Sequence, residues 1–196
     1  EAFELYVQAR QAWNLRTKAG HLRAEALLHR ALALEPKFAR AHAALADVWR
    51  NIAEYGDTLG RFDSRDSAEQ ERIVAKAREA VGLDPDSAEA HAALGAALWA
   101  GWNRAEAEVM LRRAIALNPN YASAHQWLGR ALLNEGRPAE ALAELKLATE
   151  QDPLSWIIFD NYSGALARAG NYREALAAAD RALALRSDNR AASEEY

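Results

Sequence analysis

Residues 88–120, AEAHAALGAALWAGWNRAEAEVMLRRAIALNPN, decide the fold, because their pattern returns in residues 122–153, ASAHQWLGRALLNEGRPAEALAELKLATEQDP. Each stretch closes with a phrase that ends in proline, IALNP at Pro119 and TEQDP at Pro153. The phrase VGLDP ends at Pro85, the same distance before Pro119 as Pro119 lies before Pro153. A constant period of about 34 residues is typical of stacked helical hairpins.

The same phrase extends the pattern in both directions. LALEP ends at Pro36, farther from Pro85 than one period, which indicates an insertion of about 15 residues in that repeat. LALRS ends at Ser187, one period after Pro153, where the phrase recurs without its proline. We therefore predict five hairpins in a single domain over residues 1–196. Their ranges are 5–37, 38–87 with an inserted loop at 54–67, 88–121, 122–155 and 156–189, followed by the start of a capping helix at 190–196.

Within each repeat, apolar residues at spacings of three, four and seven form one face of each of two helices. Gly95 and Gly129 fall on the apolar face of the first helix, where a small residue lets the second helix approach closely. Gly136 and Gly170 fall where the hairpin must turn. Gly20 stands in that place in the first repeat, with a hairpin one residue shorter. This pattern predicts antiparallel helical hairpins and an all-α fold.

The repeat resembles the tetratricopeptide repeat, which places a large residue, Leu-Gly, an aromatic or Leu, small second-helix residues and a closing Pro at these offsets. In the third repeat they are His91, Leu94, Gly95, Leu98 and Pro119. The resemblance implies an α-solenoid with a right-handed superhelix, whose concave groove is lined by the first helices and binds a protein or peptide.

By the same resemblance, the groove is lined by polar and small residues of four repeats. The positions are Arg40, Asp47, Arg50 and Asn51, then Glu89, Ala96 and Trp99, then Ser123, Gln126, Arg130 and Asn134, then Asp160, Gly164 and Arg168. Trp99 is the best candidate for an aromatic anchor, because aromatic side chains dominate binding hot spots. The Lys, Asn and Arg clamp of chaperone-binding repeat domains does not occupy these offsets, which argues against a chaperone tail as the partner.

A narrower resemblance suggests a context. The opening YVQARQAWNLRT, the insertion in the second repeat and the block DPLSWIIFDNYSGAL are similar to the C-terminal repeat region of bacterial multidomain regulators. In that group a winged-helix, serine/threonine kinase or adenylate-cyclase-type domain precedes the repeats. The chain starts at Glu1 without a Met, so we expect it to be the sensing or partner-binding part of a longer protein, in the cytoplasm or, after a membrane span, in the periplasm.

Composition and motifs argue against several other functions. The net charge of −4 gives no general attraction to nucleic acid, and the longest uncharged stretch, 90–103, is too short to span a bilayer. The chain has no Cys, and none of the common nucleophile, phosphate-loop, zinc-helix or dinucleotide motifs occurs. We therefore expect no catalysis, no cofactor and no metal. Homodimerisation through helical end surfaces is the main alternative to a peptide-binding groove. An enzymatic or small-molecule-binding groove is a more remote alternative.

We expect most of the histidine and tryptophan side chains to have structural roles. His42, His91 and His125 recur at one repeat offset, which places them on the order of 10 Å apart by helix-packing distances, too far to share a metal ion. We expect them to fill the large-residue position between helices. We also expect core positions for Trp13, Trp49 and Trp127, a buried wedge at Trp102 and a structural role for Trp156.

Overall fold

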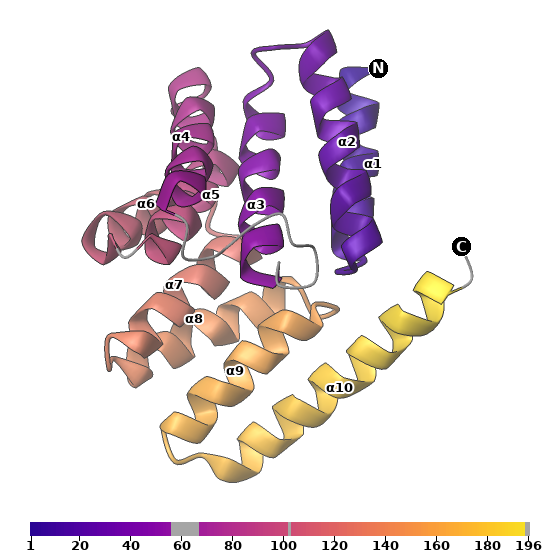
Figure 1. Ribbon diagram of the computed structural model, residues 1–196. Helices are drawn as coiled ribbons and strands as arrows, with labels where there is room; N and C mark the ends of the chain where they lie inside the picture. Colours follow the sequence, from indigo (N-terminus) through magenta and orange to yellow (C-terminus); the bar gives the residue numbers. More distant parts are fainter. Residues whose placement is uncertain (56–66, 102, 195–196) are drawn as a thin grey trace. The chain divides into compact units, whose positions relative to one another are not determined.

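The computed structural model describes residues 1–55, 67–101 and 103–194, and within these ranges it contains ten helices and no strand (Figure 1). The helices are α1 (Ala2–Asn14), α2 (Lys18–Leu34), α3 (Ala39–Tyr55), α4 (Ser67–Leu83), α5 (Ala88–Ala100), α6 (Arg104–Leu117), α7 (Ala122–Asn134), α8 (Pro138–Gln151), α9 (Trp156–Arg168) and α10 (Tyr172–Glu194). The predicted all-α class is confirmed. Residues 56–66 of the expected inserted loop, and Trp102, lie outside the described residues.

The helices form two compact units, Glu1–Leu117 with α1 to α6 and Asn118–Tyr196 with α7 to α10. In the N-terminal unit the hairpins are α1–α2, α3–α4 and α5–α6, and α3 packs on α2 as well as on α4 and α5 (Figure 1). In the C-terminal unit the hairpins are α7–α8 and α9–α10, and α8 packs on α9. Stacked helical hairpins of this kind are the architecture of α-solenoids.

Proline ends the second helix of four hairpins. The helices α2, α4, α6 and α8 each stop two residues before Pro36, Pro85, Pro119 or Pro153, because the residue before proline is driven out of the α region. At Ser187 the proline is missing, and α10 continues without a break to Glu194. The predicted separate capping helix from 190 is therefore wrong: those residues, as far as Glu194, extend α10.

Hairpin turns use a residue with positive φ placed two positions before the next helix. Gly136 (φ 77°) precedes α8 and Gly170 (φ 83°) precedes α10, as expected. In the first hairpin this residue is Arg16 (φ 53°), and Gly20 lies inside α2. Assigning Gly20 to the turn was thus wrong, because its missing side chain serves a close helix contact instead. A Cβ there would lie 2.5 Å from the carbonyl oxygen of Ala12 on α1.

The two glycines on first-helix faces mark the closest helix contacts. A Cβ at Gly95 would lie 2.6 Å from Cγ of Leu111, and one at Gly129 would lie 2.5 Å from Cγ of Leu145. Both leucines are fully buried. The predicted role of these glycines is confirmed, since real Cβ atoms do not approach so closely.

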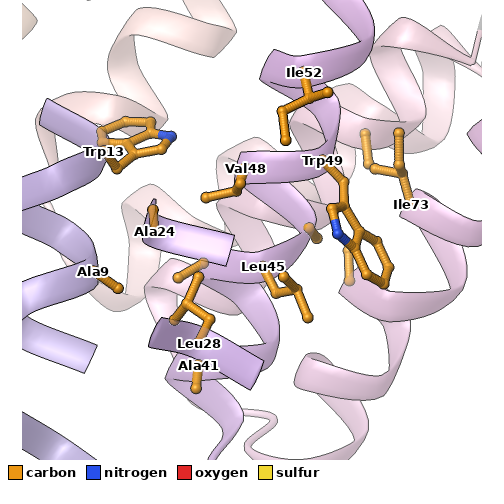
Figure 2. Close-up of a cluster of buried hydrophobic side chains, with 14 of the residues drawn as sticks. Ala9, Trp13, Ala24, Leu28, Ala41, Leu45, Val48, Trp49, Ile52 and Ile73 are labelled. Atoms are coloured by element: carbon orange, nitrogen blue, oxygen red, sulfur yellow. The ribbon is translucent and has the colours of Figure 1, made fainter. Parts of the chain in front are cut away.

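The largest apolar cluster of the N-terminal unit draws residues from α1 to α6. Figure 2 shows Trp13 of α1, Leu28 of α2, Leu45 and Trp49 of α3 and Ile73 of α4 pointing into it. The Trp49 indole donates a hydrogen bond to Oε1 of Glu25 at 3.0 Å. Trp13, Trp49 and Trp127 are all buried, which confirms their predicted core positions.

Candidate partner-binding face

The first helices of the N-terminal unit bring a cluster of charged side chains together. Arg40 of α3 forms an ion pair with Glu89 of α5, with Nε and Oε1 3.8 Å apart. Burial raises the pKa of Tyr6 on α1, and the charges of Arg10, Glu89, Arg40 and Asp47 lie close enough to act on that hydroxyl. Five polar side chains from α1, α3 and α5, distant in sequence, therefore occupy one region. We call these residues the Tyr6 cluster.

Two predicted groove residues in this unit are less accessible than an open lining implies. Arg50 and Asn51 are 5% and 3% exposed, and Arg50 Nη2 lies 3.6 Å from Oδ1 of the partly buried Asp47. The reason is the central place of α3, which packs against α1, α2, α4 and α5. Ala96 is also fully buried, and Trp99 is partly buried against the core cluster. Arg40 and Glu89 are the more exposed members of the predicted set here.

In the C-terminal unit, three of the predicted residues lie towards the C-terminal ends of α7 and α9: Arg130, Asn134 and Arg168. The guanidinium of Arg130 lies 4.5 Å from the ring centre of Trp127, and Asn134 Nδ2 donates to the Arg130 carbonyl oxygen at 3.0 Å. Arg168 of α9 donates to the Leu133 carbonyl oxygen at 3.1 Å, which links the two first helices. Gln126 is buried, whereas Asp160 on α9 is exposed.

Sequence reasoning missed the contribution of the first hairpin. Tyr6 and Arg10 belong to the Tyr6 cluster, but no groove position was predicted in α1. The repeat register pointed to them in principle, because α1 precedes α2 as α3 precedes α4. The unequal first hairpin obscured it: α2 has 17 residues and α8 has 14, so offsets counted back from the closing proline do not transfer.

The three aligned histidines bind the turns between hairpins. Nε2 of His42, His91 and His125 lies 2.8, 2.9 and 2.9 Å from the carbonyl oxygen of the closing proline six residues earlier. A carbonyl only accepts, so Nε2 carries the proton. These hydrogen bonds give the three histidines a structural role in the turns between hairpins. Among the described residues, no group of three or more His, Cys, Asp or Glu is arranged to hold a metal ion.

The repeated hairpin, with its close-contact glycine, turn histidine and closing proline, defines a helical-repeat protein. The tetratricopeptide repeat family model matches residues 103–156. Among solved structures, the chain is similar to TTC0263, a thermophilic tetratricopeptide repeat protein of Thermus thermophilus, with TM-score 0.72, 21% identity and 98% of each chain covered.

Two further solved structures are similar over most of their lengths. MamA has TM-score 0.56 and 23% identity over 92% of this chain and 95% of that one. YrrB, described as a tetratricopeptide repeat protein with an unusual peptide-binding site, has TM-score 0.53 and 23% identity over 100% of this chain and 93% of that one. None of the curated proteins compared with the chain matches it.

Together, the family model and these structures support a tetratricopeptide repeat domain. At these identities the structural likeness concerns the fold alone. In the part of the chain that the structure describes, no helix combines the length and the apolar character needed to cross a membrane.

Proposed function

We propose that this chain is a non-catalytic scaffold that binds a protein or peptide partner through the first helices of its hairpins. The observation that carries the proposal is the Tyr6 cluster, in which cationic, anionic and phenolic groups from three helices lie together. Such a mixed surface suits the backbone and charged side chains of a peptide. The peptide-binding site of YrrB shows that a protein of similar fold holds a peptide.

The wider context is part of the same proposal. The N-terminal segment YVQARQAWNLRT and the block DPLSWIIFDNYSGAL resemble the repeat region of bacterial regulators of transcription and signalling. In that setting, partner binding by the repeats controls an attached output domain. The predicted groove residues Arg40, Asp47, Arg50, Trp99, Gln126, Arg130, Asn134 and Asp160 remain the proposed partner contacts, with Arg50 and Gln126 acting from buried positions.

A charge swap tests the proposed face without removing an ion pair. The double variant Arg40→Glu with Glu89→Arg keeps the opposite charges of the α3–α5 pair and inverts their order on the face. We expect it to fold and to lose a partner captured by the parent chain from a bacterial lysate, with affinity lowered at least tenfold, because misplaced like charges are costly at an interface.

The matched control swaps a pair of similar exposure on second helices, Arg78→Glu with Glu106→Arg, whose Nη2 and Oε1 lie 2.7 Å apart. The control should capture the same partner as the parent, measured by affinity capture and mass spectrometry. Equal capture by all three folded chains would show that the α3–α5 face does not bind the partner.

Assembly through α10 is a second candidate, favoured by a difference between equivalent residues. Leu142 of α8 is partly buried against Leu166, Ala175 and Ala178 of the next hairpin. Leu176 is the equivalent residue one repeat later, and it is 67% exposed. Tyr172 and Leu183, on the same stripe of α10, are 70% and 64% exposed. A second copy covering this stripe would bury apolar surface as the next hairpin does at α8.

Light scattering after size exclusion tests this candidate. Were the stripe a dimer interface, the parent would run as a dimer, and Leu176→Lys with Leu183→Lys would convert it to a monomer. Ala177→Lys with Ala184→Lys adds the same charge at adjacent exposed positions of α10 and should leave the dimer intact. A parent that is monomeric even at about millimolar concentration removes the candidate, because dimers form by mass action.

A further inference from the structure

The three turn histidines differ in the group that meets their second ring nitrogen. Nε2 of His42, His91 and His125 donates to the carbonyl oxygen of the closing proline in each repeat. The rings are buried, so the protein supplies the surroundings of Nδ1. A neutral imidazole that donates through Nε2 can only accept at Nδ1, whereas an imidazolium can only donate there. The group opposite Nδ1 therefore indicates the charge of each ring.

One position on the second helix of the hairpin contacts Nδ1 in two repeats. In the second repeat Lys76 Nζ lies 3.4 Å from Nδ1 of His42, and in the fourth Glu144 Oε2 lies 2.6 Å from Nδ1 of His125. Lys76 follows its histidine by 34 residues and Glu144 by 19, which differ by the predicted insertion of about 15 residues. The two side chains thus occupy equivalent positions, and both are partly buried.

The charge at this position changes from repeat to repeat. In the third repeat the residue is Met110, which carries no charge, and Nδ1 of His91 has no hydrogen-bond partner among the described residues. In the second repeat Lys76 also donates to Oε2 of Glu79 at 2.7 Å, and that oxygen lies 3.5 Å from Nδ1 of His42. The ring of the second repeat therefore meets charges of both signs, and the ring of the fourth repeat meets a carboxylate.

The geometry around His125 requires a charged ring. Its Nε2 lies 2.9 Å from the Pro119 carbonyl oxygen, which also accepts from Nε2 of Gln151 at 2.8 Å, and its Nδ1 faces the Glu144 carboxylate. Two acceptors need two N–H groups, which only the imidazolium has. The proton belongs to the ring, because imidazole is more basic than a carboxylate. Among the described residues, Glu144 is the one charge that acts on this ring, and its hydrogen bond raises the pKa of His125 against the effect of burial.

We propose that the second-helix residue opposite each turn histidine sets the charge of that histidine, and that His125 and Glu144 form a proton-dependent link between α8 and the turn before α7. A neutral His125 can donate to Pro119 or to Glu144 but not to both, so its deprotonation breaks one of the two hydrogen bonds. The inference goes beyond the proposed function, because it makes the fourth repeat responsive to pH whichever partner the chain binds.

The first test measures the protonation of His125 in the full 196-residue chain. The ring signals of labelled histidine are followed by NMR from about pH 5 to about pH 9, and the His125 signal is identified by its loss in His125→Gln. We expect a titration midpoint above that of the same histidine in urea-unfolded chain. Glu144→Gln should lower the proton affinity of His125 about tenfold or more, because a glutamine amide can donate to Nδ1 of a neutral ring. Glu150→Gln removes an exposed carboxylate from the same helix and should leave the midpoint unchanged.

The second test transfers the carboxylate to the third repeat. Met110 is partly buried like Glu144, so a glutamate there can keep its charge and reach Nδ1 of His91. Met110→Glu should raise the proton affinity of His91 about tenfold or more. Met110→Gln is matched in size and should not raise it. Circular dichroism identifies the variants that fold.

The third test follows the link itself by amide hydrogen exchange. The amides of Ala124 and His125 donate to the Tyr121 carbonyl oxygen in the first turn of α7. Their protection factors, which remove the intrinsic effect of pH on exchange, should fall about fivefold in the parent as pH rises through the His125 midpoint. In Glu144→Gln they should stay constant.

The outcomes are separate from those for partner binding. A His125 midpoint that is equal in the parent and Glu144→Gln, or a His91 midpoint unmoved in folded Met110→Glu, would overturn the assignment of charge by the second-helix residue. Protection factors that ignore the His125 midpoint would overturn the link. None of these measurements uses a partner, so loss or retention of capture in the Arg40 and Glu89 charge swap leaves this inference unchanged.

Discussion

Replacing Gly129 with alanine is expected to lower the free energy of unfolding by about 2–3 kcal/mol, because the new methyl group meets a fully buried leucine in a packed core. The Cβ would lie 2.5 Å from Cγ of Leu145 and 3.2 Å from the carbonyl oxygen of Ala141, so the side chain and the backbone of α8 both obstruct it. To accept the methyl group, Leu145 must repack or α8 must shift away from α7. Urea denaturation followed by circular dichroism measures the change.

Gly82→Ala is the matched control for this prediction. Gly82 lies in α4, and nothing stands within 4 Å of the Cβ it would gain. Alanine is favoured over glycine in a helix by about 1 kcal/mol, so this variant should be at least as stable as the parent. A Gly129→Ala chain as stable as Gly82→Ala would contradict the packing assigned to α7 and α8.

Truncating Leu145 should relieve the steric clash of the methyl group added at position 129. Leu145→Ala alone is expected to cost about 2–5 kcal/mol through the cavity it leaves. In the double variant the Gly129 methyl occupies part of that cavity, so the combined loss should be smaller than the separate losses together. Strict additivity would show that the two side chains do not compete for one space.

Acidification is expected to weaken the N-terminal unit through His21. Its pKa is about 4 in the folded chain, against about 6.5 for an unperturbed histidine, because the ring is buried and Arg16 and Arg50 are near. The unfolded chain therefore binds more protons between these values, and the free energy of unfolding falls as pH drops from about 6.5 towards 4, by up to roughly 3 kcal/mol. Urea midpoints measured across this range test the slope.

His21→Leu should flatten this acid dependence, whereas His29→Leu, which removes an exposed histidine from the same helix, should preserve it. His125 is expected to have the opposite effect on the pH dependence of stability. Its Nδ1 lies 2.6 Å from Oε2 of Glu144, and that hydrogen bond raises the pKa of the histidine. The C-terminal unit thus gains stability from the protonated ring at low pH and loses it as pH rises through the raised pKa. An unchanged acid slope in His21→Leu would contradict its burial as a neutral ring.

Several local features were predictable from the sequence. The prolines marked the ends of α2, α4, α6 and α8, since proline acts on the residue beside it. Gly136 and Gly170 marked turns for the same local reason. Gly20 misled the prediction because glycine serves two needs, a left-handed turn and a close helix contact, and the sequence does not distinguish them. Ser187 misled it because the phrase around it looks like a helix end without the residue that stops a helix.

For the candidate site, the sequence predicted which positions share a helix face, but it did not predict how buried those positions are or which charges surround them. The offsets of Arg40, Asp47 and Glu89 identified positions that do lie together on the first helices. They gave no indication that Arg50 and Asn51 are buried, or that Trp13 carries two arginines on its ring. Periodicity assigns a residue to a side of its own helix. Burial depends on which other helices cover that side.

The constant repeat period, the helical hairpins and their stops thus follow from the chain read alone, because they depend on neighbouring residues and on a pattern that repeats. Packing decided the rest: that Gly20 serves the close contact between α1 and α2 while Arg16 takes the turn, and that the buried ring of His21 lies near Arg16 and Arg50. These outcomes arise from contacts between helices far apart in sequence, where burial and charge are set by every neighbour at once.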